Sequence, residues 1–165
     1  MQGRKESTEP QDIFNTKSQR LKGTEDMKRR VLILCTGNSA RSQLAEALVN
    51  ARLGADWESF SAGTQPAERV NPNALTVLAE MGIQTTGSRP KHISTFMGQP
   101  FDVIITVCDD AAENCPVWLG QGKRLHIGFP DPAAVTGDSE TVLRAFRQTR
   151  EAIIERLLPV LNDMQ

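Results

Sequence analysis

The sequence predicts an α/β fold of three layers, in which a four-stranded parallel sheet is flanked by helices. Two observations lead to this prediction. Val31–Leu34 and Val103–Ile105 are short, unbroken apolar runs rich in branched side chains, a pattern typical of strands buried on both faces. Segments with the apolar spacing of helices separate the predicted strands, and strands that alternate with helices form parallel sheets.

Each element is expected from its own local pattern. In chain order, the predicted strands are Val31–Cys35, Trp57–Ser61, Phe101–Val107 and Arg124–Ile127. The predicted helices are Ser42–Leu53, a helix that begins at Asn71-Pro72, and a long closing helix over Ser139–Leu161. Gly54 and Gly82 are suited to end the first two helices, and Ser139 is suited to cap the third.

The chain length and composition indicate one folded domain. With 165 residues, 39% of them hydrophobic, the chain can bury one sizeable core but is too short for two ordinary domains. Residues 1–27 are mostly polar and charged, so we expect a disordered N-terminal extension there without a catalytic role. The folded domain is expected over residues 28–165.

The charge balance excludes some classes of partner. The 19 basic and 20 acidic residues nearly cancel, so no overall field favours nucleic acid or an anionic membrane. No apolar run approaches the roughly 20 residues needed to span a bilayer, and the N-terminus lacks the apolar core of a signal peptide. We therefore expect a cytoplasmic protein. In that compartment thiols stay reduced, so the three cysteines are expected to be catalytic, metal-binding or inert.

A predicted anion-binding loop connects the first strand to the first helix. Cys35 and Arg41 enclose five residues whose N–H groups can point into one concavity, which the Arg41 guanidinium can close. The positive end of the following helix faces the same place and favours the thiolate form of Cys35. The residues expected to bind an oxyanion are Thr36, Gly37, Asn38, Ser39, Ala40, Arg41 and Ser42.

Several residues of this loop have an expected individual role. Gly37 can adopt a positive φ, Asn38 can hold the loop by side-chain hydrogen bonds, and Ser42 can donate its hydroxyl to the Cys35 sulfur. Cys35, Cys108 and the loop 129–132 each follow a predicted strand, so one edge of the sheet should bring all three together. The sequence therefore predicts that Cys35 is the nucleophile of an enzyme that acts on an oxyanion.

The run from Cys35 to Ser42 resembles the phosphate loop of low-molecular-weight tyrosine phosphatases and of the thioredoxin-coupled arsenate reductases that share their fold. The resemblance extends from Arg30 to about Asn162. It implies that Asp131, in the pair Asp131-Pro132, is the general acid. From the residues alone, a carboxylate that stabilises a turn is the favoured interpretation of Asp131.

Two features favour the reductases over the phosphatases. Phosphatases of this fold typically have a Tyr soon after the Asp-Pro pair, whereas this chain contains no Tyr at all. The segment from Val107 to Pro116, with Cys108 and Cys115 separated by six residues, resembles the redox segment of the reductases. Two alternatives remain for these cysteines: they could be small buried residues, or zinc ligands together with Cys35 and His126.

The resemblance implies an arsenate reductase that works by a three-cysteine relay. Cys35 would attack arsenic, Cys108 would attack Cys35, and Cys115 would attack Cys108, leaving a disulfide for thioredoxin to reduce, with glutaredoxin as the alternative donor. No tightly bound cofactor is implied, although some of these reductases bind potassium through residues that match Asn38 and Glu46. The alternatives are a phosphatase that acts through a Cys35 phosphocysteine and a non-enzymatic oxyanion or redox sensor.

Overall fold

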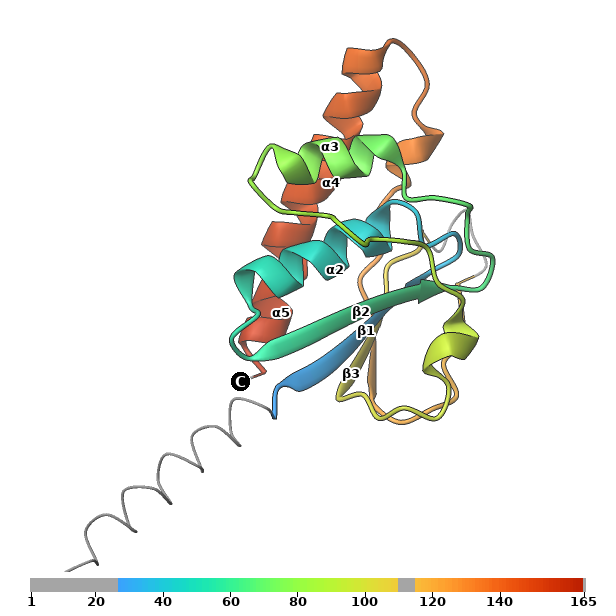
Figure 1. Cartoon of the computed structure of the whole chain (residues 1–165), viewed down its shortest axis with the longest axis vertical. Coiled ribbons are helices and arrows are strands. Elements are labelled where there is room, and N and C mark those ends of the chain that lie inside the picture. The colour runs from blue at the N-terminus through green and yellow to red at the C-terminus, as the bar shows by residue number, and fades with distance from the viewer. Residues whose placement is uncertain (1–26, 110–114, 165) are drawn as a thin grey trace, which may run out of the picture.

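The computed structural model describes residues 27–109 and 115–164, and it confirms the predicted fold class. Four parallel strands form one sheet in the order β2-β1-β3-β4 (Figure 1). Their bounds are Arg29–Cys35 for β1, Trp57–Gly63 for β2, Val103–Thr106 for β3 and Lys123–His126 for β4. The expected extension at residues 1–27 lies almost wholly outside the described residues and stays a prediction.

The helices follow the strands in the predicted order. The α-helices are α2 (Arg41–Arg52), α3 (Pro72–Ala79), α4 (Ser139–Arg156) and α5 (Leu158–Asn162). Two short 3-10 helices are η1 (Ile93–Phe96) and η2 (Pro132–Ala134). Asn71 caps α3 by accepting the Asn73 N–H, and Gly82 follows that helix with a φ of 72°. These features match the predicted start and end of the second helix.

The predicted closing helix is wrong in two respects. It ends at Arg156 and continues as a separate helix α5, because Pro159 lacks an N–H and its ring clashes with the carbonyl of the preceding turn. Its cap is Asp138, not Ser139: the Asp138 carboxylate accepts the Thr141 N–H at 2.7 Å, and Ser139 is already the first helical residue.

The sheet has a different cover on each face. On one face, Val31 and Ile33 of β1 pack in a cluster with buried residues of α2, α3, α4 and α5. On the other face, Leu32 and Leu34 pack with Phe96, Phe101 and Trp118. In the described part of the chain, this second face is covered by η1 and by loops rather than by an α-helix. Successive side chains of β1 point to opposite faces of the sheet, and both faces are covered, which explains why the apolar run is unbroken.

The strand order places a ligand site at a specific point of the sheet. The chain leaves β1 for a neighbour on one side, β2, and later returns to the other side as β3. In open parallel sheets, ligands bind beyond the carboxyl ends of the strands where the order reverses in this way. Cys35 is the last residue of β1 and lies at this point. None of the described helices is long and apolar enough to cross a membrane.

Candidate active site

The loop after β1 forms one wall of a small cavity. The cavity has a volume of about 200 Å³ and is lined by Cys35, Thr36, Gly37, Asn38, Ser39, Ala40, Arg41, Asp131 and Ala133. The structure thus brings together the loop from Cys35 to Arg41 and the Asp131 loop, as expected from their positions at strand ends. Ser42 is fully buried and contacts the Cys35 sulfur without lining the cavity.

The Cys35 sulfur receives two polar contacts. The Asn38 backbone N–H donates to Sγ at 3.2 Å, and Ser42 Oγ lies 2.9 Å from Sγ. Asn38 Nδ2 donates to Ser42 Oγ at 2.8 Å, so the Ser42 hydroxyl proton is directed to the sulfur. Two donors aimed at one sulfur stabilise the thiolate, which is the nucleophilic form of cysteine.

Asn38, and not Gly37, has the positive φ of this loop. Its φ is 48°, a left-handed conformation that Asn tolerates better than most residues. The predicted hydrogen bonds are present: the Asn38 carbonyl oxygen Oδ1 accepts the Lys91 backbone N–H at 2.8 Å and Gln43 Nε2 at 3.1 Å. The prediction for Gly37 was wrong because these side-chain bonds hold the turn one residue further on, at a fully buried residue.

Two residues that support the loop were not predicted. A Cβ atom on Gly63, at the end of β2, would lie 2.3 Å from the Thr36 carbonyl oxygen, so only glycine allows this close approach. Gln43 donates from Nε2 to the carbonyl oxygens of Asn38 and Arg89 as well as to Asn38 Oδ1. A glycine at a strand end is only a weak indication of such a close contact, and a Gln in a helix gives no indication that it supports a loop.

Arg41 and Asp131 come from different ends of the chain and meet at the cavity. Arg41 is 5% exposed and its Nη1 donates to the Phe129 carbonyl at 3.0 Å. Its Nη2 lies 3.9 Å from Asp131 Oδ2. Asp131 Oδ1 accepts the Ala133 N–H at 3.0 Å and so caps η2, which also bears out the turn-stabilising interpretation. The second carboxylate oxygen remains directed toward Arg41 and the cavity.

All three cysteines lie in the described residues, and none forms a disulfide. Leu34 of β1 pairs with Thr106 of β3, so Cys35, the last residue of β1, and Cys108, two residues after β3, lie at the carboxyl ends of two neighbouring strands. Cys35 and Cys108 belong to one buried apolar cluster, and Cys115 packs against it. Cys108 is fully buried and Cys115 is partly buried. Residues 110–114 between them lie outside the described residues.

The structure gives no support to the zinc alternative. Within residues 27–109 and 115–164, no three His, Cys, Asp or Glu side chains come together as a metal-binding group. His126 Nδ1 lies 2.7 Å from Thr106 Oγ1, at the ends of β3 and β4. The other interpretation, buried small cysteines, describes the burial of Cys108 but not the partial exposure of Cys115.

The family model of low molecular weight phosphotyrosine protein phosphatase matches residues 30–165. The chain belongs to this family. Its curated relatives include arsenate reductases of Halalkalibacterium halodurans, 38% identical over 79% of this chain and 93% of that protein, and of Bacillus subtilis, 39% identical over 77% and 91%. A crystal structure of arsenate reductase from Archaeoglobus fulgidus is 33% identical, with a TM-score of 0.57 over 76% of this chain and 96% of that chain.

These relatives place the chain among the arsenate reductases of the phosphatase family. The match from residue 30 includes the loop after β1 and the Asp131 loop, so the whole cavity lies inside the family's domain. No aromatic side chain is among the residues that line this cavity, which has Ala133 beside Asp131. A phenol ring would therefore have no aromatic wall to stack on in this part of the structure.

Proposed function

We propose that this protein is an arsenate reductase that reduces arsenate to arsenite through Cys35, Cys108 and Cys115. The observation that carries the proposal is the placement of the cysteines. Cys35 begins the loop that lines the cavity, Cys108 belongs to the same apolar cluster, and Cys115 packs against that cluster. A hydrolytic phosphatase needs the first of these cysteines and has no use for the other two.

The first step forms a bond between Cys35 and arsenic. Loop N–H groups and the Arg41 guanidinium hold the tetrahedral oxyanion, and the Cys35 thiolate attacks arsenic. Asp131, on the same cavity, gives a proton to the departing hydroxide, which leaves as water. The product is a thiol-bound arsenate in which arsenic is still pentavalent.

The second step moves two electrons. The Cys108 thiolate attacks the Cys35 sulfur and forms a Cys35–Cys108 disulfide. The bonding pair between sulfur and arsenic passes to arsenic, which leaves as trivalent arsenite. The burial of Cys108 in the same apolar cluster as Cys35 supports this step, because a sulfur that is out of reach of solvent attacks another sulfur within the protein rather than an external disulfide.

The third step returns Cys35 to its thiol form. Cys115 attacks Cys108, which frees Cys35 and leaves a Cys108–Cys115 disulfide. Because Cys108 is fully buried in the thiol state, its segment must rearrange before another protein can reach this disulfide. The partner that reduces it is a dithiol protein of the thioredoxin class, with glutaredoxin as the alternative donor.

Disulfide mapping after a single turnover tests the relay. The reduced protein receives arsenate without a reductant, and the disulfides are identified by peptide mass. We expect Cys108–Cys115 in the wild type and Cys35–Cys108 in Cys115→Ser. A coupled assay with thioredoxin, thioredoxin reductase and NADPH, repeated with glutaredoxin, identifies the donor. If arsenate consumes no reducing equivalents with either donor, the proposed function is wrong.

The same loop and acid also suit a phosphatase, so para-nitrophenyl phosphate hydrolysis is the control reaction. Rapid hydrolysis that survives Cys108→Ser and Cys115→Ser, without arsenate turnover, would instead assign the protein as a phosphatase. Stoichiometric binding of arsenate without any turnover would assign it as a sensor. The same set of measurements therefore distinguishes a phosphatase and a sensor from a reductase.

A further inference from the structure

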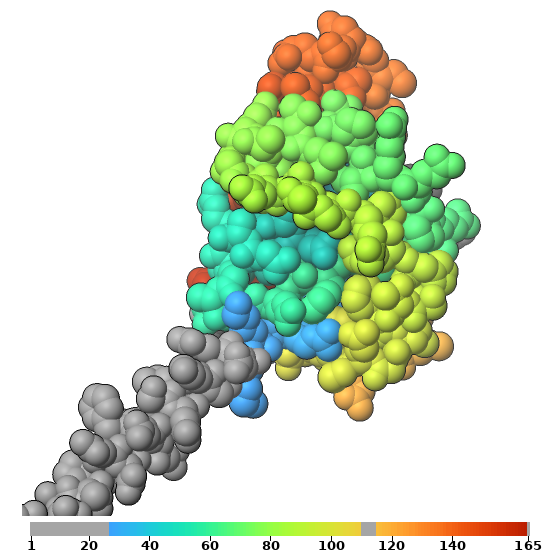
Figure 2. All heavy atoms as spheres, in the orientation of Figure 1, coloured from blue at the N-terminus to red at the C-terminus, as the bar shows by residue number. Residues whose placement is uncertain are grey.

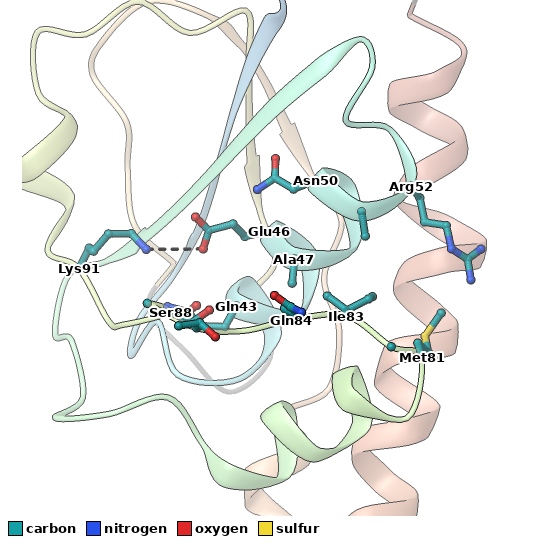
Figure 3. A pocket seen from close by; sticks show the side chains of 14 residues that line it. Gln43, Glu46, Ala47, Asn50, Arg52, Met81, Ile83, Gln84, Ser88 and Lys91 are labelled. Atoms are coloured by element: carbon teal, nitrogen blue, oxygen red, sulfur yellow. Dashed lines mark hydrogen bonds and ion pairs between the residues drawn. The ribbon is translucent and has the colours of Figure 1, made fainter.

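A polar groove lies between α2 and the segment 81–91. It has a volume of about 670 Å³, and its lining includes Gln43, Glu46 and Lys91 (Figure 3). In the space-filling view, the segment 81–91 lies across the surface of α2 (Figure 2). The groove shares no lining residue with the substrate cavity, but it includes Gln43, whose side chain donates to the Asn38 carbonyl of the oxyanion loop.

The charges along this groove are unequal. Of the residues that line it, Glu46 is the single carboxylate, against the two cations Arg52 and Lys91. Glu46 Oε2 accepts the Ser61 hydroxyl at 2.6 Å and lies 3.5 Å from Lys91 Nζ. The side chains of Glu46 and Lys91 are 20% and 17% exposed, so the pair is largely shielded from water.

The oxygen atoms of Asn38 and Glu46 do not suit the potassium ion that the resemblance suggested as a ligand of this region. Such a site needs oxygen atoms that are open to a cation. Asn38 Oδ1 already accepts the N–H groups of Lys91 and Gln43, and Glu46 Oε2 already accepts a hydroxyl and faces an ammonium group. A potassium ion there would also lie next to the positive charge of Lys91.

Lys91 contacts three parts of the structure around the oxyanion loop. Its backbone N–H donates to Asn38 Oδ1 at 2.8 Å, and its carbonyl accepts the Gly63 N–H at 2.9 Å. Its ammonium donates to the Arg89 carbonyl at 3.2 Å and faces Glu46. One residue thus joins the loop, the end of β2 and the α2 carboxylate.

We propose that Lys91 is a positioning residue for the oxyanion loop, and that its ammonium neutralises Glu46 where a bound monovalent cation would otherwise be needed. Glu46 lies four residues after Ser42 and so on the same face of α2, one turn from the Cys35 sulfur contact. An uncompensated carboxylate at this point opposes both the thiolate and an incoming oxyanion. The proposal rests only on the oxyanion-binding part of the proposed function.

Phosphate binding tests this proposal without any redox chemistry. Calorimetric titration of the full-length reduced protein with inorganic phosphate is done in choline chloride and in potassium chloride at equal ionic strength. We expect the wild type to bind phosphate equally in both salts. Lys91→Met should bind about tenfold more weakly in choline chloride, since it leaves a shielded carboxylate unpaired. Potassium chloride should strengthen binding by Lys91→Met and leave the wild type unchanged.

Three further variants separate neutralisation from a general structural role. Lys91→Arg keeps the charge and should bind phosphate nearly as the wild type does. Adding Glu46→Gln to Lys91→Met removes the uncompensated charge and should restore binding to within about threefold. Lys123→Met, at an exposed lysine on β4, is the matched control and should have no effect.

The proposal is overturned if Lys91→Met binds phosphate as Lys123→Met does, or if Glu46→Gln fails to restore it. A wild type that binds phosphate more tightly in potassium chloride than in choline chloride also overturns it. The melting temperature of each variant confirms that the protein titrated is folded. Because phosphate binding needs no electron transfer, a failure of arsenate reduction would leave this result interpretable.

Discussion

At the residue scale, Asn38 is where the hydrogen bonds of the oxyanion loop converge. Its backbone N–H reaches the Cys35 sulfur, its Nδ2 reaches Ser42, and its Oδ1 binds Gln43 and Lys91. Because the Lys91 N–H can only donate, it determines which side of the Asn38 amide is the acceptor. That choice in turn directs the Ser42 proton toward the thiolate. The nucleophile is thus oriented through a chain of bonds that begins outside the loop.

Ser42→Ala tests the hydroxyl in this chain. Loss of a hydrogen bond to a charged sulfur should lower kcat for arsenate reduction about 10- to 100-fold, because such bonds are worth roughly 1.5–3 kcal/mol. Steady-state kinetics in the coupled assay measures the effect. Ser139→Ala, at an exposed serine of α4, is the matched control. An unchanged kcat in Ser42→Ala would contradict a role for the hydroxyl.

Asp131→Asn tests the proposed acid. It should lower kcat by about 10²-fold or more, since a positioned general acid contributes roughly 10²–10⁴-fold. Phosphate binding should be equal or tighter, because the substitution removes a negative charge from the wall of the anion cavity. If phosphate binding fails together with kcat, Asp131 acts mainly by holding the loop through its cap on η2.

The sequence was informative for the residues that define the loop and uninformative for those that support it. Cys35, Arg41 and Asp131 were predicted because each lies at a strand end or in a recognisable short motif. Lys91, Gln43 and Gly63 depend on contacts between segments far apart in the chain, for which a single sequence has no periodicity or spacing to read. The error at Gly37 arose because hydrogen bonds at Asn38 outweigh glycine's backbone freedom.

At the element scale, the end of β2 limits how the loop can lie. The Gly63 position faces the Thr36 carbonyl, and Gly63 itself donates its N–H to Lys91. The strand therefore supports the anion loop from one side and the 81–91 segment from the other. The predicted strand ended at Ser61, two residues short of this contact.

Gly63→Ala tests this support. The added methyl group cannot fit 2.3 Å from a carbonyl oxygen, so the loop must move away from β2. Phosphate affinity and kcat should both fall by about tenfold or more, since displacements of about 1 Å can cost roughly 10²-fold in rate. Circular dichroism should still show the sheet. Wild-type phosphate affinity in Gly63→Ala would show that the loop adapts at little cost.

Helices α3 and α4 are joined by an ion-pair cluster whose strength depends on pH. The hydrogen bond from Arg147 is the main cause that lowers the pKa of Glu80 below its usual 4.5; burial opposes it, and the hydrogen bond from Arg150 lowers the pKa further. A carboxyl group with a lowered pKa in the folded state stabilises the fold above its unfolded pKa. This contribution is lost as the pH falls through the folded value.

Glu80→Gln should therefore melt at a lower temperature than the wild type at pH 7, and the difference should shrink as the pH falls below about 4.5. Thermal unfolding followed by circular dichroism from pH 7 to pH 3 measures this. Glu155→Gln, at an exposed position of α4, is the control and should show no such pH-dependent difference. A constant difference across the pH range would mean that the pair contributes through packing alone.

At the scale of the whole molecule, the fold could be predicted because its apolar pattern is consistent along the chain. Unbroken apolar runs gave the buried strands, and helical spacing gave the elements between them. The break at Leu157 was missed because the apolar spacing continues across Pro159. Because Cys35, Cys108 and the Asp131 loop lie at or after the carboxyl ends of parallel strands, the fold alone predicts that they share one edge of the sheet.

Deletion of residues 1–26 tests the expected division of the chain. A protein that begins at Met27 retains all of the sheet and the complete loop, so its melting temperature and kcat should equal those of the full chain. Differential scanning fluorimetry and the coupled assay compare the two proteins. Loss of arsenate turnover on deletion would contradict this division and would assign the N-terminal segment a role in the reaction.

The unequal burial of the three sulfurs has a consequence for chemical damage. Cys35 is 3% exposed and Cys108 is fully buried, whereas Cys115 is only partly buried. Peroxide and alkylating agents that enter from solvent therefore meet Cys115 first. Irreversible oxidation there leaves the nucleophile intact but stops regeneration, so a poisoned molecule should complete one turnover and then stall with arsenite already released.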